Sequence, residues 1–229
     1  MRELFKDYGI SLTEEKEKKL CLFYYFLTEY NNRINLTSIT EEKEVWIKHF
    51  LDSCIGEEFF TENASVIEIG SGGGFPSIPL KIIRSDLKFT LCDSTGKKCE
   101  YIKEAVNYLG LENVEVVCAR AEDLGKNPVY REKFDVVTAR AVARLNTLSE
   151  YCLPLVKQGG KFVAYKGEAE EEVNEAKNAV EILGGKISDI KKTELPFGSG
   201  ERNIIVIDKI KKTPPSYPRG NGKERKKPL

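Results

Sequence analysis

The fold is decided by the stretch Val66-Ile67-Glu68-Ile69-Gly70-Ser71-Gly72-Gly73-Gly74-Phe75-Pro76. The apolar residues 64–69 predict a buried strand, and the glycine-rich turn that follows ends at Pro76, just before a helical segment. A tight strand-to-helix turn requires positive φ angles and lets the backbone approach a ligand closely, and glycine allows both. We therefore expect a ligand-binding turn at the carboxyl end of this strand.

The spacing of the glycines indicates the ligand. A dinucleotide fingerprint requires Gly-x-Gly-x-x-Gly, but its third glycine would fall at Phe75 or at Ser77, so both readings fail. The chain instead has acid-x-Gly-x-Gly-x-Gly, made by Glu68, Gly70, Gly72 and Gly74. This spacing resembles the S-adenosylmethionine loop of class I methyltransferases, where the acid suits a ligand carrying an ammonium and a sulfonium. The alternative is a glycine-rich turn that binds no ligand.

The rest of the chain predicts an α/β fold. Strands are expected at 64–69, 87–92, 113–118, 134–139, 160–166, 186–192 and 203–208, and helices at 77–84, 95–109, 147–156 and 168–183. This alternation indicates a mostly parallel, doubly wound sheet. The segment between the last two strands is too short for a crossover helix, so these strands should form an antiparallel hairpin. We divide the chain into an N-terminal helical cap (1–60), a methyltransferase domain (61–209) and a basic, proline-containing tail (210–229).

The cap is expected to hold two main helices. One begins after Thr13, which is placed to cap it, and buries Leu20, Phe23, Tyr24 and Leu27; the other runs from about residue 41 to 56. The charged opening residues do not make a signal peptide, and no apolar run in the N-terminal region approaches the length of a membrane span. We expect a cytoplasmic monomer that binds no membrane.

The six cysteines are scattered, with no Cys-x-x-Cys pair and no histidine in zinc spacing. We therefore interpret them as reduced thiols in the core and expect no metal site.

Charge is distributed unevenly although the net charge is zero. Residues 209–229 contain eight Lys or Arg and one Glu, so they carry +7 and the preceding residues carry −7. An acidic body with a basic tail suggests a polyanionic partner. The prolines oppose a helix, so we expect an extended or disordered arm along RNA phosphates, with Lys211, Lys212 and Arg219 as contacts. Removing this arm should leave cofactor binding intact.

Three groups of residues follow successive strands and could hold the cofactor. Asp93 ends the second strand, 23 residues after Gly70, where a carboxylate can accept both ribose hydroxyls; its alternative role is to cap the next helix. Ser94 and Thr95 follow it. Ala121 and Glu122 come after the third strand, where the adenine amino group would lie, although they could equally be a plain helix start.

Basic residues follow the next strands. Arg140 and Arg144 come after the fourth strand and Lys166 ends the fifth. Since no Asn/Asp-Pro-Pro-Tyr motif is present, we expect these side chains to pair with a phosphate or donate to a base carbonyl, with surface ion pairs as the alternative. His49, the one histidine, is expected to be a packed residue and not a general base.

Across nearly its whole length the chain resembles the RsmG (GidB) family of bacterial 16S ribosomal RNA methyltransferases. The resemblance rests on Asn35-Leu36-Thr37, His49-Phe50-Leu51-Asp52-Ser53, Gly70–Pro76, Leu91–Ser94, Ala121-Glu122, Ala139-Arg140-Ala141, Lys166-Gly167, Arg202-Asn203, Lys212-Thr213-Pro214 and Tyr217-Pro218-Arg219. It implies N7 methylation of a guanine in the 530 loop of 16S rRNA, in the rRNA or a small-subunit precursor, with S-adenosylmethionine as cofactor. It maps cofactor contacts onto Gly70, Phe75, Asp93, Ser94, Ala121, Glu122 and Arg140. Arg202 joins the expected RNA contacts.

Guanine N7 carries a free lone pair at neutral pH, so this reaction needs no general base; Arg140 and Lys166 are then candidates for positioning the substrate. Three alternatives remain open from the sequence. They are a methyltransferase with another substrate, a non-catalytic RNA-binding factor with the same fold and, against the glycine spacing, a dehydrogenase.

Overall fold

The computed structural model describes residues 1–229 and contains one seven-stranded sheet in the order β3-β2-β1-β4-β5-β7-β6. Neighbouring strands from β3 to β5 are parallel, whereas β7 pairs antiparallel with both β5 and β6. The strands are β1 (Ser65–Ile69), β2 (Lys88–Asp93), β3 (Val114–Cys118), β4 (Phe134–Arg140), β5 (Val156–Lys166), β6 (Gly185–Leu195) and β7 (Gly200–Lys209). The predicted parallel sheet and its terminal hairpin are therefore confirmed.

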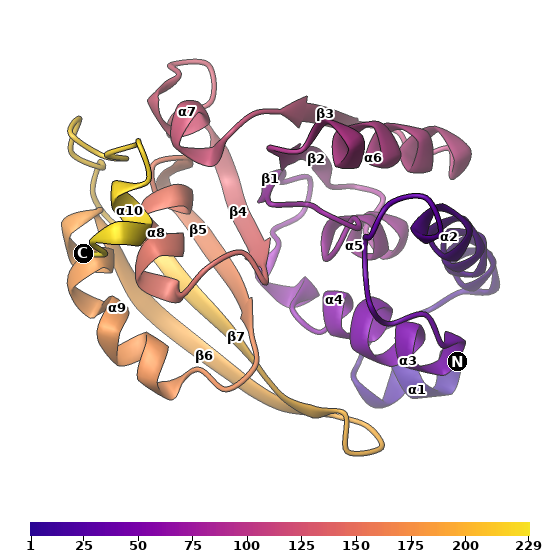
Figure 1. Ribbon diagram of the computed structural model, residues 1–229. Helices are drawn as coiled ribbons and strands as arrows, with labels where there is room; N and C mark the ends of the chain where they lie inside the picture. Colours follow the sequence, from indigo (N-terminus) through magenta and orange to yellow (C-terminus); the bar gives the residue numbers. More distant parts are fainter.

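Helices cover both faces of this sheet (Figure 1). They are α1 (Arg2–Asp7), α2 (Glu14–Asn31), α3 (Glu42–Val45), the π-helix η1 (Trp46–Leu51), α4 (Asp52–Cys54), the 3₁₀ turn η2 (Glu57–Phe59), α5 (Ser77–Ile83), α6 (Gly96–Tyr108), α7 (Ala121–Lys126), α8 (Leu145–Cys152), α9 (Glu170–Ile182) and α10 (Lys223–Lys226). The cap of α2 is confirmed, because the Thr13 side chain accepts a hydrogen bond from the Lys16 amide. The predicted second cap helix contains a π-helical turn that the sequence did not indicate.

Alternation along the strands divides the core into two apolar clusters. Val66, Val136 and Val163 belong to the cluster under α2, α5 and α6. The residues that follow two of them, Ile67 and Val137, belong to the cluster under α8 and α9. Successive strand side chains point to opposite faces, so a strand covered on both sides must be apolar at nearly every position. The cap helices share the first cluster, so they belong to the same folded unit as the sheet.

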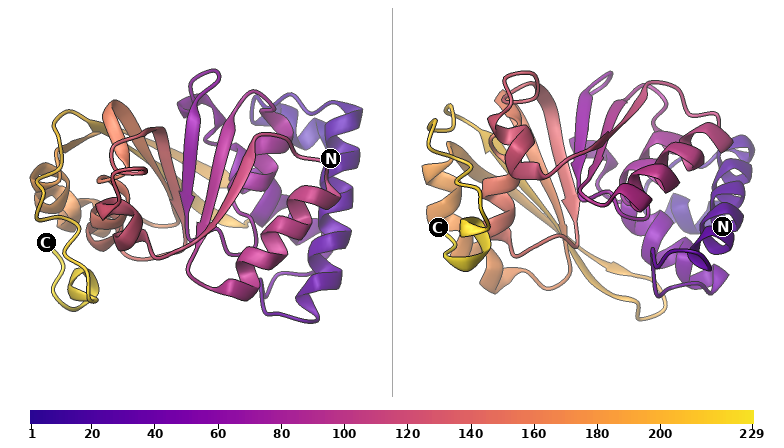
Figure 2. Two further views of the ribbon diagram at one scale, coloured as in Figure 1. Left: turned by 90° about the horizontal axis from the view of Figure 1, so that it is seen from above. Right: turned by 45° about the horizontal axis from the view of Figure 1, so that its top comes forward.

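Two expectations about exposure are corrected. Cys118, at the end of β3, is exposed and Cys21 is only half-buried, so only four of the six free thiols lie in the core. The tail is not a solvated arm: it follows β7 and packs along α7 and α8 as far as α10 (Figure 2). Arg131 holds it by donating to the carbonyls of Thr213, Pro214 and Tyr217. These contacts use backbone carbonyls, which a composition-based prediction does not consider.

No helix is both long enough and apolar enough to cross a bilayer. No group of three acidic, histidine or cysteine side chains is arranged to hold a metal ion.

Candidate cofactor and substrate cavities

The glycine-rich turn after β1 is held against the end of β2 by its backbone. The amides of Gly70 and Ser71 both donate to the Cys92 carbonyl, at 2.8 and 3.0 Å. The Gly72 amide donates to Asp93 Oδ2 at 3.0 Å, and the Thr95 amide donates to Asp93 Oδ1 at 2.9 Å. Asp93 therefore joins the two turns that follow β1 and β2, and the Asp93 side chain is not the N-cap of α6, which begins after Thr95.

Gly72 is the glycine of this turn whose missing side chain leaves open space. Its φ is +50°, and a Cβ atom built there would have only the Gly70 carbonyl oxygen, at 3.7 Å, nearby. An L-residue is strained at this φ, and its side chain would project into the open space above the turn. That space is where a ligand can approach the backbone.

Glu68 lies beneath the turn. Its carboxyl is fully buried, and Oε2 accepts a hydrogen bond from the Ser77 amide at 3.3 Å while Oε1 has no partner. Burial, partly offset by Ser77 and by the Arg140 charge, raises the pKa of Glu68 to about 8. The structure thus places this predicted cofactor residue behind the turn, at the start of α5, and not on a cavity wall.

A cavity of about 320 Å³ opens at the carboxyl ends of β1, β2 and β3. Such crevices are where open α/β sheets bind ligands, and the volume is in the usual range for a small-molecule site. Five of the predicted cofactor residues line it, and eight other residues complete the wall: Gly70, Asp93, Ser94, Ala121 and Glu122, with Ile69, Cys92, Ala119, Arg120, Val142, Tyr151, Gly222 and Arg225. The two carboxylates of this mixed polar and apolar wall, Asp93 and Glu122, suit the hydroxyls and amino group of an adenosine.

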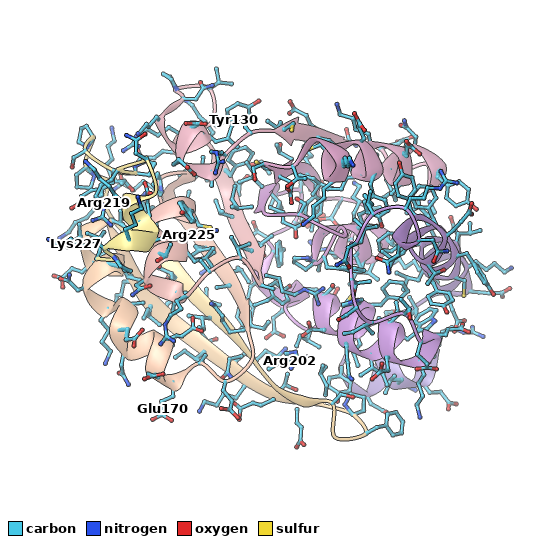
Figure 3. All side chains as sticks on the ribbon, in the orientation of Figure 1. Tyr130, Glu170, Arg202, Arg219, Arg225 and Lys227 are labelled. Carbon is cyan, nitrogen blue, oxygen red and sulfur yellow. The ribbon has the colours of Figure 1, made fainter.

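The tail supplies part of this wall, which the sequence did not predict. Gly222 and Arg225 line the cavity beside Tyr151 of α8. Arg219, predicted to bind RNA phosphates, is instead paired with the buried Glu150: its Nη2 lies 2.6 Å from Glu150 Oε2, and its amide donates to Oε1 at 2.8 Å. Figure 3 shows Arg219 and Arg225 on this segment. Lys211 and Lys212 are exposed just after the end of β7, where β7 pairs with the start of β6.

A second cavity, also of about 320 Å³, lies on the other side of the loop after β4. Arg140 and Ala141 line it, whereas the next residue, Val142, lines the first cavity. Ala141 has a φ of +58°, a left-handed conformation that is uncommon for a residue with a side chain. The remaining lining residues are Ile39, Lys48, His49, Asp52, Tyr165, Lys166, Gly167 and Arg202.

Asp52 organises the cations of the second cavity. It is buried, with Oδ2 2.7 Å from Arg140 Nη1 and Oδ1 2.9 Å from Arg202 Nε. Two guanidinium groups therefore share one carboxylate, which leaves one positive charge unbalanced. Arg202 Nη2 makes no hydrogen bond within the protein. The cavity thus offers a cation and free N–H donors to an anionic or carbonyl-bearing ligand.

His49 is held as a neutral side chain in this wall. Burial and the Arg140 charge lower its pKa to about 3. His49 Nδ1 lies 3.1 Å from the Lys48 carbonyl oxygen and 3.2 Å from Arg140 Nη2, and Nε2 lies 2.8 Å from Thr37 Oγ1. The ring also stacks on Phe75, with centroids 4.4 Å apart. Both ring nitrogens are engaged within the protein.

Other predicted site residues are distributed between the two cavities and the surface. Phe75 is buried beneath Arg140, whose guanidinium lies 5.0 Å from the centre of the ring. Lys166 pairs with Glu172 at 2.7 Å and donates to the Ala143 carbonyl at 2.6 Å. Gly74 packs on α5, Thr95 is exposed before α6, and Arg144 pairs with the acids of α9 at Glu171 and Glu175.

Sequence reasoning gave no role to Asp52, Tyr151, Val142 or Arg225. Asp52 lies within the motif His49–Ser53, four positions after Lys48. A carboxylate at this place in a family motif was a signal that could have identified it. The other three come from separate segments that meet only in the folded chain, and no local pattern marks them.

Comparisons with known proteins agree with this geometry. The rRNA small subunit methyltransferase G (GidB) family matches residues 16–205. Two relatives with the name ribosomal RNA small subunit methyltransferase G are those of Brevibacillus brevis, 50% identical over 99% of this chain and 97% of that protein, and Lactobacillus acidophilus, 48% identical over 97% and 95%.

Among solved structures, an S-adenosylmethionine-dependent methyltransferase from Aquifex aeolicus superposes with a TM-score of 0.56 at 20% identity, over 79% of this chain and 97% of that one. M. jannaschii TYW2 in complex with AdoMet has the same TM-score at 18% identity, over 69% and 75%. These structures show the class I, Rossmann-like methyltransferase fold. The family match and the identity over the full length show that this chain belongs to the GidB family of small-subunit rRNA methyltransferases.

Proposed function

We propose that this enzyme, an S-adenosylmethionine-dependent rRNA methyltransferase, methylates N7 of a guanine in the 530 loop of 16S rRNA. The observation that carries the proposal is the pair of cavities on either side of residues 140–142, of which the first holds Asp93 and Glu122 and the second has one unbalanced positive charge. A base in the second cavity would lie next to the methyl group of a cofactor in the first.

The residues of the first cavity fit the cofactor. Asp93 and Glu122 provide acceptors for ribose hydroxyls and an adenine amino group, and the open space above Gly72 admits the amino-acid part. The cofactor supplies an electrophilic methyl group on a sulfonium. The chain's own part is to orient that group and to exclude water around it.

Guanine N7 is the nucleophile that best suits the second cavity. Its lone pair can form the N–CH₃ bond as the S–CH₃ bond breaks, so no proton has to be removed. This agrees with His49, whose two ring nitrogens already have partners within the protein. Arg202 and Lys166 are placed to donate to guanine O6 or to a flanking phosphate, the pairing that arginine and lysine make with guanine edges.

Positioning is then the role of the Asp52–Arg140–Arg202 group. Asp52 fixes both guanidinium groups, which removes the entropy cost of ordering them when RNA binds. Methylation at N7 leaves a positive charge on the base. The unbalanced cation of the cavity repels that charge, which favours release of the product.

The experiment is methylation of small ribosomal subunits and of free 16S rRNA from a bacterium that lacks this family's enzyme, using labelled S-adenosylmethionine. N7-methylguanosine is located by borohydride reduction and aniline cleavage. We expect one cleavage site in the 530 loop, loss of activity in Arg140→Ala, and normal activity in Arg33→Ala, an exposed arginine in the turn after α2. A methyl group on another atom or in another loop would disprove the proposal. Failure to bind S-adenosylhomocysteine would favour a non-catalytic RNA-binding role.

A further inference from the structure

The C-terminal segment 219–227 is folded onto the enzyme next to the first cavity. Its anchor is Arg219, whose guanidinium pairs with Glu150, a carboxylate that is 1% exposed. Farther along, the Gly220 amide donates to the Glu224 carboxylate, and Thr147 Oγ1 of α8 donates to the Glu224 carbonyl at 3.0 Å. Glu224 is itself buried. A charged segment held by a buried ion pair and buried hydrogen bonds has a defined place in the structure.

This anchoring brings two tail residues to the cavity. Gly222 and Arg225 line it together with Glu122 and Tyr151. The positive charge of Arg225 opposes the rise in the pKa of Tyr151 that burial and the Glu122 charge produce. A carboxylate, a phenol and a guanidinium thus share the wall of this cavity. Planar aromatic and guanidinium groups bind the faces of heteroaromatic rings.

We propose that residues 219–227 are part of the cofactor site and form its outer wall, with Arg225 covering the adenine ring. The ligand class is an adenosine nucleoside, and the inference rests on the assignment of the first cavity to the cofactor. It reverses the expectation that the tail serves RNA alone and can be removed without affecting cofactor binding. Since the segment contributes to the site only when docked, cofactor and tail stabilise each other.

The test measures binding of S-adenosylhomocysteine to the full-length protein by isothermal titration calorimetry. Arg225→Ala should raise the dissociation constant by about three- to thirtyfold, the range expected for loss of a guanidinium–ring contact. Lys226→Ala is the matched control, because it removes the same charge from the same short helix but Lys226 does not line the cavity. Arg219→Ala should also weaken binding, although Arg219 does not touch the cavity, because it loosens the anchor.

Hydrogen exchange gives a readout that does not depend on a substitution. In the wild-type protein, amides 219–227 should exchange more slowly when S-adenosylhomocysteine is bound. If Arg225→Ala binds as tightly as wild type and exchange in 219–227 is unchanged by ligand, the tail is not part of the site. If wild type itself fails to bind S-adenosylhomocysteine, the assignment of the cavity fails, which is a different result. If Lys226→Ala and Arg225→Ala weaken binding of S-adenosylhomocysteine equally, the effect comes from the loss of a positive charge and not from a contact of Arg225. This result would also overturn the proposal.

Discussion

Glu68→Gln should make the ligand-free protein more stable, and increasingly so as the pH rises. The Glu68 carboxyl is fully buried, with one oxygen unpartnered, and its pKa is raised from 4.5 to about 8. Gln is close in size, keeps an oxygen to accept from the Ser77 amide, and cannot ionise. The substitution therefore removes the cost of burying this group while leaving the packing beneath the turn nearly unchanged.

The sign and magnitude of the difference in free energy of unfolding follow from the pKa of Glu68 in the folded state compared with its ordinary value. A carboxyl with a raised pKa in the folded state contributes stability that is complete below pH 4.5 and is lost as the pH rises to about 8. Each pH unit in this window costs about 1.4 kcal/mol. The advantage of Gln is therefore about zero near pH 4, about 3 kcal/mol at pH 7 and about 5 kcal/mol at pH 9, relative to wild type.

The assay is urea unfolding of wild type and Glu68→Gln at these three pH values, without cofactor. Taking the difference between the two proteins cancels the titration of every other group. Glu100→Gln, on the exposed side of α6, is the control and should give a difference close to zero throughout. A difference for Glu68→Gln that does not depend on pH, or that favours wild type at high pH, would refute the argument.

Three further predictions concern the two cavities. Gly72→Val should abolish binding of S-adenosylhomocysteine, and Asp93→Ala should weaken it by about 1–3 kcal/mol because charge-assisted hydrogen bonds are lost; unchanged affinity by calorimetry in both variants would remove these residues from the site. His49→Gln should keep substantial turnover, and, since the pKa of His49 is about 3, the rate should show no bell-shaped pH dependence near neutrality; complete loss of activity in a folded, cofactor-binding variant would make His49 a candidate base. Arg202→Ala should weaken RNA binding and lower the slope of log affinity against log salt by about 1, as expected for one lost phosphate contact; an unchanged slope in filter binding would place Arg202 away from the phosphates.

Local patterns were sufficient to predict the sheet. Consecutive apolar residues occur within β1 (66–67), β4 (136–137) and β7 (204–207) because both faces are covered there, and this pattern is visible without any tertiary information. The hairpin of β6 and β7 followed from the short loop before Gly200. The π-helical turn at Trp46–Leu51 could not be predicted in this way. Over little more than one turn, the spacing of apolar residues does not distinguish a π-helix from an α-helix.

The turns at the carboxyl edge were also predictable, because parallel strands bring their carboxyl ends together. Gly70, Asp93, Ser94, Ala121 and Glu122 were named from their positions after strands, and all of them line one cavity. Glu68 was not distinguishable from a ligand-facing acid, since only the packing of α5 shows that its carboxyl points beneath the turn.

The sequence by itself thus determined the succession of strands and helices along the chain, the glycine turn and the family, because each depends on residues close together in the sequence. Only the tertiary structure decided the partners of the charges. Arg140 and Arg202 share Asp52, and Arg219 is neutralised by Glu150, although 69 residues separate that pair. A charged side chain can reach several partners in an unfolded chain, and which one it keeps is set by the buried carboxylate that the fold places beside it.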